Sequence, residues 1–173
     1  MINLDRVIQP PERLEIPPNE PVIFLNGPIQ GTSDWQKEAI EIIHWGNPEI
    51  WIFNPRRDIP FAENDQKEYQ RQVRWELFYR DLISHRRTGV NLFWLARERW
   101  HDHERPYAQT TRVETGVSLM EKKYAGAKIV FGAEKGYSGV KYLDEMFKFY
   151  CLEVVIHDNL VATCNEALKL LKS

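Results

Sequence analysis

The residues whose types and spacing are best suited to chemistry lie at 110–116 and read Thr-Thr-Arg-Val-Glu-Thr-Gly. This segment opens a predicted helix, and we expect Glu114 in its first turn, where backbone N–H groups and the helix dipole favour an ionised carboxylate. Attack on the anomeric carbon of a sugar requires such a carboxylate, as in retaining glycosidases. The alternative is an ordinary capping box, in which Glu114 accepts from the backbone amide of Thr111. The residues by themselves favour the capping box, because it is a common start signal of helices.

A second set of polar residues belongs to the helix predicted over residues 66–84. On a helical wheel Gln72, Glu76 and Arg80 fall inside the broad apolar arc of this helix instead of on its polar side. Burying a polar group without a partner costs roughly 1 to 3 kcal/mol, so we expect these side chains to orient a ligand or to form a subunit contact. The alternative is a self-contained pair of Glu76 and Arg80 at helical spacing.

A loop that follows the first predicted strand contains further candidate ligand residues. It begins with Asn26, Gly27 and Pro28, and glycine lets the backbone approach a ligand closely. The loop lacks the G-x-G-x-x-G spacing of dinucleotide-binding proteins. The alternative is a tight connection to a helix that Ser33 caps with Gln36 as its capping-box partner.

The loop after the second predicted strand carries two consecutive arginines. Asn54 and Arg56 are candidate substrate-binding residues here, and the guanidiniums of Arg56 and Arg57 are suited to pair with phosphate or carboxylate. The alternative is surface charge, with Arg57 beside Asp58, because exposed ion pairs usually contribute little.

The sequence gives little sign of a cofactor. Residues 101–104, His-Asp-His-Glu, are metal-ligand types without the spacing of a known metal site. The chain also lacks a P-loop and the G-x-S-x-G motif of serine hydrolases. We therefore expect a reaction that needs neither a metal nor an organic cofactor.

The candidate residues need a framework of alternating strands and helices. Short apolar runs predict five buried strands, at residues 22–25, 50–53, 90–95, 128–131 and 153–156. Amphipathic stretches predict five helices, at residues 34–45, 66–84, 112–124, 139–150 and 160–171. This alternation predicts a single doubly wound α/β domain, with a five-stranded parallel sheet in the flavodoxin-like order 2-1-3-4-5. Ligands bind such sheets beyond the carboxyl ends of the strands, near the point where strand order reverses.

The length of 173 residues suits one domain. We assign residues 22–173 to the α/β domain and residues 1–21, which hold five of the ten prolines, to an extended arm that packs on the domain or on a partner. The net charge of -2 gives no electrostatic reason to bind a nucleic acid polymer or an anionic membrane, which favours a small substrate. Two cysteines without metal or disulfide spacing, and the lack of a signal-peptide or membrane-span pattern, predict a soluble cytoplasmic protein.

Five segments, taken together, resemble the nucleoside 2-deoxyribosyltransferase-like family in their order and approximate spacing. They are residues 23–29 (IFLNGPI), 53–57 (FNPRR), 72–76 (QVRWE), 92–94 (LFW) and 110–116 (TTRVETG). The resemblance covers about residues 22–131, and the last strand and helix match in pattern only. It implies a flavodoxin-like fold and cleavage of a deoxynucleoside N-glycosidic bond through a glutamate nucleophile, which falls on Glu114. The deoxyribosyl group then passes to another base, or to water in the hydrolase relatives.

The sequence departs from the better-known family members at two positions where they have aspartates. After the third strand it has Leu95 and Ala96, and before the nucleophile it has Ala108. Other groups must therefore protonate the departing base and hold the sugar hydroxyls. The candidates for these roles are Glu76, Glu98, Asp102 and Tyr107.

The resemblance leads us to expect a nucleoside or nucleotide substrate. Its base would lie between Trp94 and the glycine loop, while Gln72 and Glu76 bind polar atoms of the sugar or base, and Thr111 would also belong to the site. Family relatives build sites at subunit contacts, and the wide apolar arc of helix 66–84 likewise predicts a homo-oligomer.

Two alternatives stay open at this point. One is an N-glycosidase that acts on a nucleotide, with Arg56 and Arg57 holding the 5′-phosphate. The other is a non-catalytic sensor of a nucleotide-derived ligand, because one fold hosts many functions and the usual aspartates are absent.

Overall fold

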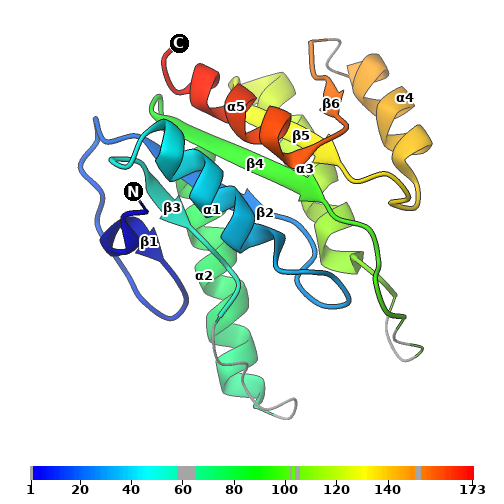
Figure 1. Cartoon of the computed structure of the whole chain (residues 1–173), viewed down its shortest axis with the longest axis horizontal. Coiled ribbons are helices and arrows are strands. Elements are labelled where there is room, and N and C mark those ends of the chain that lie inside the picture. Colours follow the sequence, from blue (N-terminus) through cyan, green and yellow to red (C-terminus); the bar gives the residue numbers. More distant parts are fainter. Residues whose placement is uncertain (1, 58–64, 102, 104–105, 151–152) are drawn as a thin grey trace.

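The computed structural model describes residues 2–57, 65–101, 103, 106–150 and 153–173. Within these residues the chain forms one all-parallel sheet of six strands in the order β1-β3-β2-β4-β5-β6 (Figure 1). The strands are β1 (Val7–Ile8), β2 (Val22–Asn26), β3 (Trp51–Phe53), β4 (Gly89–Leu95), β5 (Ile129–Ala133) and β6 (Ile156–His157). The predicted α/β class with a parallel sheet is confirmed.

The predicted number of five strands is wrong, and the predicted order is incomplete for the same reason. The order 2-1-3-4-5 omits β1, which comes from the N-terminal arm and pairs with β3 at the edge of the sheet. The five strands that follow residue 21 lie in the order β3-β2-β4-β5-β6, so β1 extends the sheet outward. A strand of two residues is too short to show alternation of apolar and polar side chains, and the nearby prolines masked it further.

Five α-helices cover the two faces of the sheet in the described part of the chain (Figure 1). Helices α1 (Trp35–Gly46) and α5 (Leu160–Leu170) pack on one face. Helices α2 (Gln66–Ser84), α3 (Gln109–Ala125) and α4 (Val140–Tyr150) pack on the other. All five helices were predicted, and α2 has the predicted bounds. None of the described helices has the length and apolar character needed to cross a membrane.

Alternation along the central strands explains how two apolar cores form. In β2, Ile23 and Leu25 face α1 and α5, whereas Phe24 faces α2. In β4, Trp94 joins the α1 and α5 side, whereas Phe93 joins the α3 and α4 side. Successive side chains of a strand point to opposite faces, so strands that are apolar throughout are buried on both.

The N-terminal arm packs on the domain along β3 and α2. After a 3-10 helix (Leu4–Arg6) and β1, it runs across α2, where the Trp75 Nε1 group donates to the Glu12 carbonyl at 2.6 Å. The Tyr79 hydroxyl oxygen accepts from the Leu14 backbone N–H at 2.9 Å. Residues of the arm therefore share one apolar cluster with α2, which includes Ile8 and Ile16.

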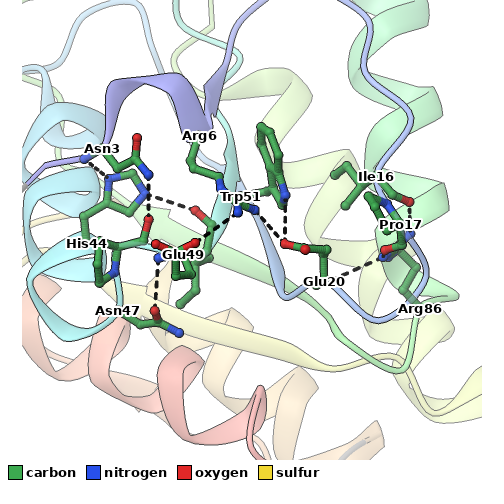
Figure 2. A network of polar contacts seen from close by, with 12 residues as sticks. Asn3, Arg6, Ile16, Pro17, Glu20, His44, Asn47, Glu49, Trp51 and Arg86 are labelled. Atoms are coloured by element: carbon green, nitrogen blue, oxygen red, sulfur yellow. Dashed lines mark hydrogen bonds and ion pairs between the residues drawn. The ribbon is translucent and has the colours of Figure 1, made fainter.

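A group of contacts that we call the arm anchor (Arg6, Glu20, Glu49 and Trp51) fixes the start of the chain (Figure 2). The Arg6 guanidinium contacts the Glu20 carboxylate at 2.6 Å and the Glu49 carboxylate at 3.0 Å, and it lies 4.4 Å from the centre of the Trp51 ring. The Trp51 Nε1 group donates to the same Glu20 oxygen at 3.2 Å. The hydrogen bond from Arg6 lowers the pKa of Glu20.

Candidate functional site

A cavity of about 680 Å³ opens where β2, β3 and β4 end, at the predicted edge of the sheet. Its walls are the loop after β2, the inner side of α2, the first two turns of α3 and the long connection between β4 and α3. Seven of the predicted site residues line it: Asn26, Gly27, Pro28, Gln72, Glu76, Thr111 and Glu114. The structure thus brings most of the candidate residues together from three separate segments of the chain.

The glycine loop, residues 26–31, is packed tightly against the end of β4 and the connection that follows it. Gly27 has a φ of 154°, and a side chain on it would come within 2.3 Å of the Trp94 carbonyl oxygen. Gly31, with a φ of 72°, lies against Trp100 and the ring of Tyr107. Only glycine fits such close approaches at positive φ, so both glycines shape the wall of the cavity.

The alternative explanation of this loop, a Ser33 cap with a Gln36 capping box, is wrong. Helix α1 is capped by Asp34, whose side chain accepts from the Lys37 backbone N–H at 3.1 Å. The Gln36 side chain points elsewhere and accepts from the Arg56 Nε group at 2.9 Å.

A chain of hydrogen bonds lines the cavity and runs from the loop after β3 to α2. The Arg57 Nε group donates to the Gln72 side-chain oxygen at 2.8 Å. The Gln72 amide donates to the Pro55 carbonyl at 2.8 Å and to the Glu76 carboxylate at 2.5 Å. These contacts fix the orientation of the Gln72 amide, because its oxygen faces a donor and its nitrogen faces two acceptors.

Burial raises the pKa of Glu76 to about 7. This value already includes a smaller rise from the charge of Glu114, and the hydrogen bond from Gln72 and the charges of Arg80 and Arg57, which lower the pKa. The predicted alternative, a self-contained ion pair of Glu76 with Arg80, is wrong: among the described residues, no such pair forms. Arg80 is only 7% exposed, and its buried Nε has no hydrogen-bond partner in the described part of the chain.

The start of α3 differs from both predictions made for Glu114. The helix begins at Gln109 after Ala108, which adopts the left-handed conformation with a φ of 53°, so Glu114 lies in the second turn. Glu114 is therefore no capping-box partner of Thr111. It also lies too far along α3 to accept hydrogen bonds from the free N–H groups of the first turn. The expected setting for an ionised carboxylate is also wrong, because burial raises the pKa of Glu114 and the charge of Arg80 opposes that rise.

Three predicted substrate-binding residues do not line the cavity. The side-chain oxygen of Asn54 accepts from the Arg56 backbone N–H at 3.0 Å within its own turn. Arg56 donates to Gln36 and to the Ile29 carbonyl at 2.9 Å each, so it braces the glycine loop. Trp94 is 5% exposed and packs in the core on the α1 and α5 side, so it is not positioned to stack on a base in this cavity.

Two aromatic cavity residues were missed from the sequence, whereas Arg57 was named there only as a partner for phosphate or carboxylate. Arg57 lines the cavity in place of Arg56, and the aromatic side chains of Tyr69 and Trp100 contribute to the walls. The length and aromatic content of the connection between β4 and α3 were the signal for Trp100. Arg57 had no such signal, because the sequence did not tell which of two consecutive arginines faces the site.

The remaining candidates for a proton donor have contrasting surroundings. Glu98 and Tyr107 line the cavity. The Tyr107 hydroxyl donates to the Ala96 carbonyl at 2.6 Å, and burial raises its pKa. A Glu98 oxygen lies 2.7 Å from His101 Nδ1.

Some residues that bear on the sequence predictions lie outside the described part of the chain. They are Asp58, Asp102, Glu104 and one of the two cysteines, Cys151. No cluster of three metal-ligand residues occurs in the part of the chain that is described.

Asn26 connects the cavity to a row of buried polar side chains between the helices. Its amide donates to the Asn91 side-chain oxygen at 3.2 Å, and the Asn91 amide donates to the Ser84 hydroxyl at 2.9 Å. The Ser84 hydroxyl in turn donates to the Glu121 carboxylate on α3 at 2.8 Å. This row holds the Asn26 side chain in one orientation at the end of β2.

No protein-family model matches this chain, and no curated protein sequence matches it. The resemblance described above therefore depends on its five short segments. Four of them, residues 23–29, 53–57, 72–76 and 110–116, contribute residues to the cavity wall, whereas residues 92–94 do not.

Proposed function

We propose that this protein cleaves the N-glycosidic bond of a deoxynucleoside and transfers the deoxyribosyl group to another base. The single observation that carries the proposal is one cavity lined by two carboxylates, Glu76 and Glu114, beside a glycine loop. Retaining glycosidases use two carboxylates in this way, one as nucleophile and one to manage protons. The volume of about 680 Å³ suits a ligand of nucleoside size.

Glu114 is the nucleophile in this proposal. Its carboxylate attacks C1′ of the sugar, an oxocarbenium-like transition state forms, and the product is a glycosyl ester of the enzyme. Burial disfavours the charge on Glu114, and formation of the neutral ester removes that charge. The nearby charge of Arg80 opposes the effect of burial and favours the ionised carboxylate that attacks.

The aromatic residues of the wall supply a surface for the base. Tyr69, Trp100 and Tyr107 line the cavity, whereas Trp94 lies in the core, so we revise the stacking partner to this group. Stacking on aromatic rings tolerates different bases, which suits a reaction that exchanges one base for another.

The surroundings favour a substrate without a 5′-phosphate. Arg56 is engaged with the glycine loop, and Arg57 is engaged with Gln72 and forms an ion pair with Glu68 at 3.1 Å. The cavity wall also carries Glu98 in addition to the two site carboxylates, which would repel a phosphate dianion. We therefore rank the nucleoside above the nucleotide.

The test is incubation of the purified protein with a 2′-deoxynucleoside and a different free base, followed by chromatographic separation of the products. A new nucleoside establishes transfer, whereas free base and free deoxyribose establish hydrolysis. The same assay with the 5′-monophosphate tests the preference for an unphosphorylated sugar. A panel of purine and pyrimidine pairs that yields neither product would overturn the proposal, and tight binding without turnover would indicate a sensor.

We also propose that copies of the chain associate through the outer side of α2. Leu77 and Phe78 are 49% and 58% exposed there, and Tyr69 is exposed beside the cavity. Light scattering on size-exclusion chromatography tests this, with Phe78→Glu expected to yield monomers. The matched control is Tyr142→Glu, at an exposed aromatic residue of α4. A wild-type protein that is monomeric at all concentrations would contradict the proposal.

A further inference from the structure

The departing base must receive a proton, because a nucleobase that leaves as an anion is a poor leaving group. Among the described side chains of the cavity, three were candidates to donate this proton: Glu76, Glu98 and the hydroxyl of Tyr107. The Tyr107 hydroxyl already donates to the Ala96 carbonyl. Glu98 is hydrogen-bonded to His101 at the outer end of the cavity, where its side chain is 31% exposed. Glu76 lies on the inner side of α2 and lines the same cavity as Glu114, the glutamate of α3 that attacks the sugar.

We propose that Glu76 is the acid that protonates the departing base and the base that deprotonates the incoming acceptor. This inference rests on the proposed N-glycosidic cleavage by Glu114 and adds the second catalytic residue of that reaction. It is carried by the position of Glu76 in the cavity wall and by the hydrogen bond from Gln72 that holds its carboxyl group.

The hydrogen bond from Gln72 determines which Glu76 oxygen carries the proton. The Gln72 amide nitrogen donates to Glu76 Oε1, and in a carboxylic acid the carbonyl oxygen is a stronger acceptor than the hydroxyl oxygen, so this contact favours Oε1 as the carbonyl oxygen. The proton therefore lies on Oε2. Gln72 cannot rotate its amide to reverse this arrangement without losing its contacts to Arg57 and to the Pro55 carbonyl.

The charged groups around Glu76 favour a state in which Glu114 is ionised and Glu76 is protonated. Glu114 faces it from α3, Arg80 lies one turn further along α2, and Arg57 approaches from the loop after β3. When Glu114 is ionised, its charge disfavours ionisation of Glu76. Glu114 is therefore the nucleophile, and Glu76 holds the proton. The arginines partly offset the repulsion, which leaves the pKa of Glu76 at about 7 and allows it to release the proton at neutral pH.

The two half-reactions balance without any further reagent. In the first, a Glu114 oxygen forms a bond to C1′, the C1′–N bond breaks with its electron pair moving to the base nitrogen, and the Glu76 Oε2 proton moves to the base. Neutral base, glycosyl ester and Glu76 carboxylate result. In the second, Glu76 removes a proton from an acceptor N–H or from water, the acceptor attacks C1′, and the ester bond breaks to restore the Glu114 carboxylate.

The first test varies the need for a proton. The Glu76→Gln variant should slow cleavage of 2′-deoxyguanosine by roughly 10²- to 10⁴-fold, whereas 7-methyl-2′-deoxyguanosine, whose cationic base leaves neutral without a proton, should lose less than about tenfold. For an enzyme restricted to pyrimidines, 2′-deoxyuridine and its 5-nitro derivative form the equivalent pair. Equal losses on both members of the pair would overturn the assignment. The control is Glu145→Gln, at an exposed carboxylate of α4 that should leave both rates unchanged.

The second test reads the proton directly and does not depend on turnover. Carbon-13 NMR of the glutamate carboxyl groups, with Glu76 identified by its absence in Glu76→Gln, should show a carboxyl that titrates near pH 7. A Glu76 carboxyl fully ionised below pH about 5 would overturn the proposal, whether or not a substrate has been found. A wild-type enzyme that turns over, with Glu76→Gln equally active, would reject Glu76 and leave the proposed function intact. A wild-type protein inactive on every nucleoside pair would reject the proposed function itself.

Discussion

The arm anchor and the cavity each place a glutamate near arginine, with opposite results. In the arm anchor, Glu20 contacts Arg6 at 2.6 Å, and this hydrogen bond lowers its pKa. In the cavity, Glu76 has its hydrogen bond from the neutral amide of Gln72, and burial raises its pKa to about 7. Direct contact with a guanidinium stabilises a carboxylate, whereas an arginine at longer range does not outweigh the loss of water.

This difference separates a structural contact from a reactive one. The Glu20 carboxylate stays charged at neutral pH and holds the arm to β3 through Arg6 and Trp51. Glu76 exchanges its proton near neutral pH, which is what acid and base chemistry needs. The predictions that follow test the contrast, beginning with the largest expected effect.

The largest effect is expected for Glu114→Gln. The amide is not a nucleophile, so transfer should fall by roughly 10³-fold or more, measured as initial rates of product formation. Loss of the Glu114 charge should also lower the pKa of Glu76, because that charge raises it in the wild type. Unchanged activity, or an unchanged Glu76 titration by NMR, would contradict the coupling of the two glutamates.

The next largest effect is expected in the pH dependence of the protein's stability, through Glu76 in the cavity. Folding raises the pKa of Glu76 from 4.5 to about 7, so the folded state keeps a proton that the unfolded state releases. The stabilising contribution is present below pH about 4.5 and is lost as the pH rises through about 7. This loss of unfolding free energy amounts to about 3 kcal/mol at most, and Glu76→Gln should remove it. The measurement is the difference in unfolding free energy between denaturant titrations at pH 5 and at pH 8. Parallel pH dependences of the variant and the wild type would contradict it.

A smaller effect is expected where the arm crosses α2. Tyr79→Phe removes the hydroxyl that accepts from the Leu14 N–H, and it should cost about 1 kcal/mol of unfolding free energy. Hydrogen exchange of the Leu14 amide should increase at the same time. Tyr142→Phe, at an exposed tyrosine of α4, is the control that should leave both measurements unchanged.

The smallest effect is expected for Glu20→Gln, and its sign is opposite to that of Glu76→Gln. Because folding lowers the pKa of Glu20, its contribution to stability is present above pH 4.5 and is lost as the pH falls through the lowered value. The variant should therefore lose less thermal stability than the wild type between pH about 6 and about 3. An equal loss in both proteins would show that the arm anchor has no share in acid unfolding.

The sequence was sufficient for the helices and for the four inner strands, because apolar periodicity controls which faces are buried. The last strand was predicted at 153–156 and overlaps β6 only at Ile156. It was misleading at α3, where Thr111 and Glu114 have capping-box spacing while the helix begins earlier, after Ala108 and without a side-chain cap. A helix start that depends on backbone conformation alone leaves no pattern of residue types to detect.

The candidate site was predicted as a set of segments, and the errors concern the direction of single side chains. Trp94 was placed in the site, but in β4 it faces α1 and α5, and the alternation of a strand does not say which face meets the cavity. Arg56 and Arg57 were likewise indistinguishable, although only Arg57 lines the cavity. These choices depend on tertiary packing, which periodicity does not contain.

The two outermost strands of the sheet have a consequence for how copies of this protein meet. Strands β1 and β6 span two residues each, so the sheet offers few unpaired backbone groups along its edges. Long exposed edges invite strand pairing between molecules and, in time, fibre-like aggregation. Short edge strands reduce that risk for a parallel sheet, and they fit the proposal that copies of the chain associate through a helix, α2, instead of through paired strands.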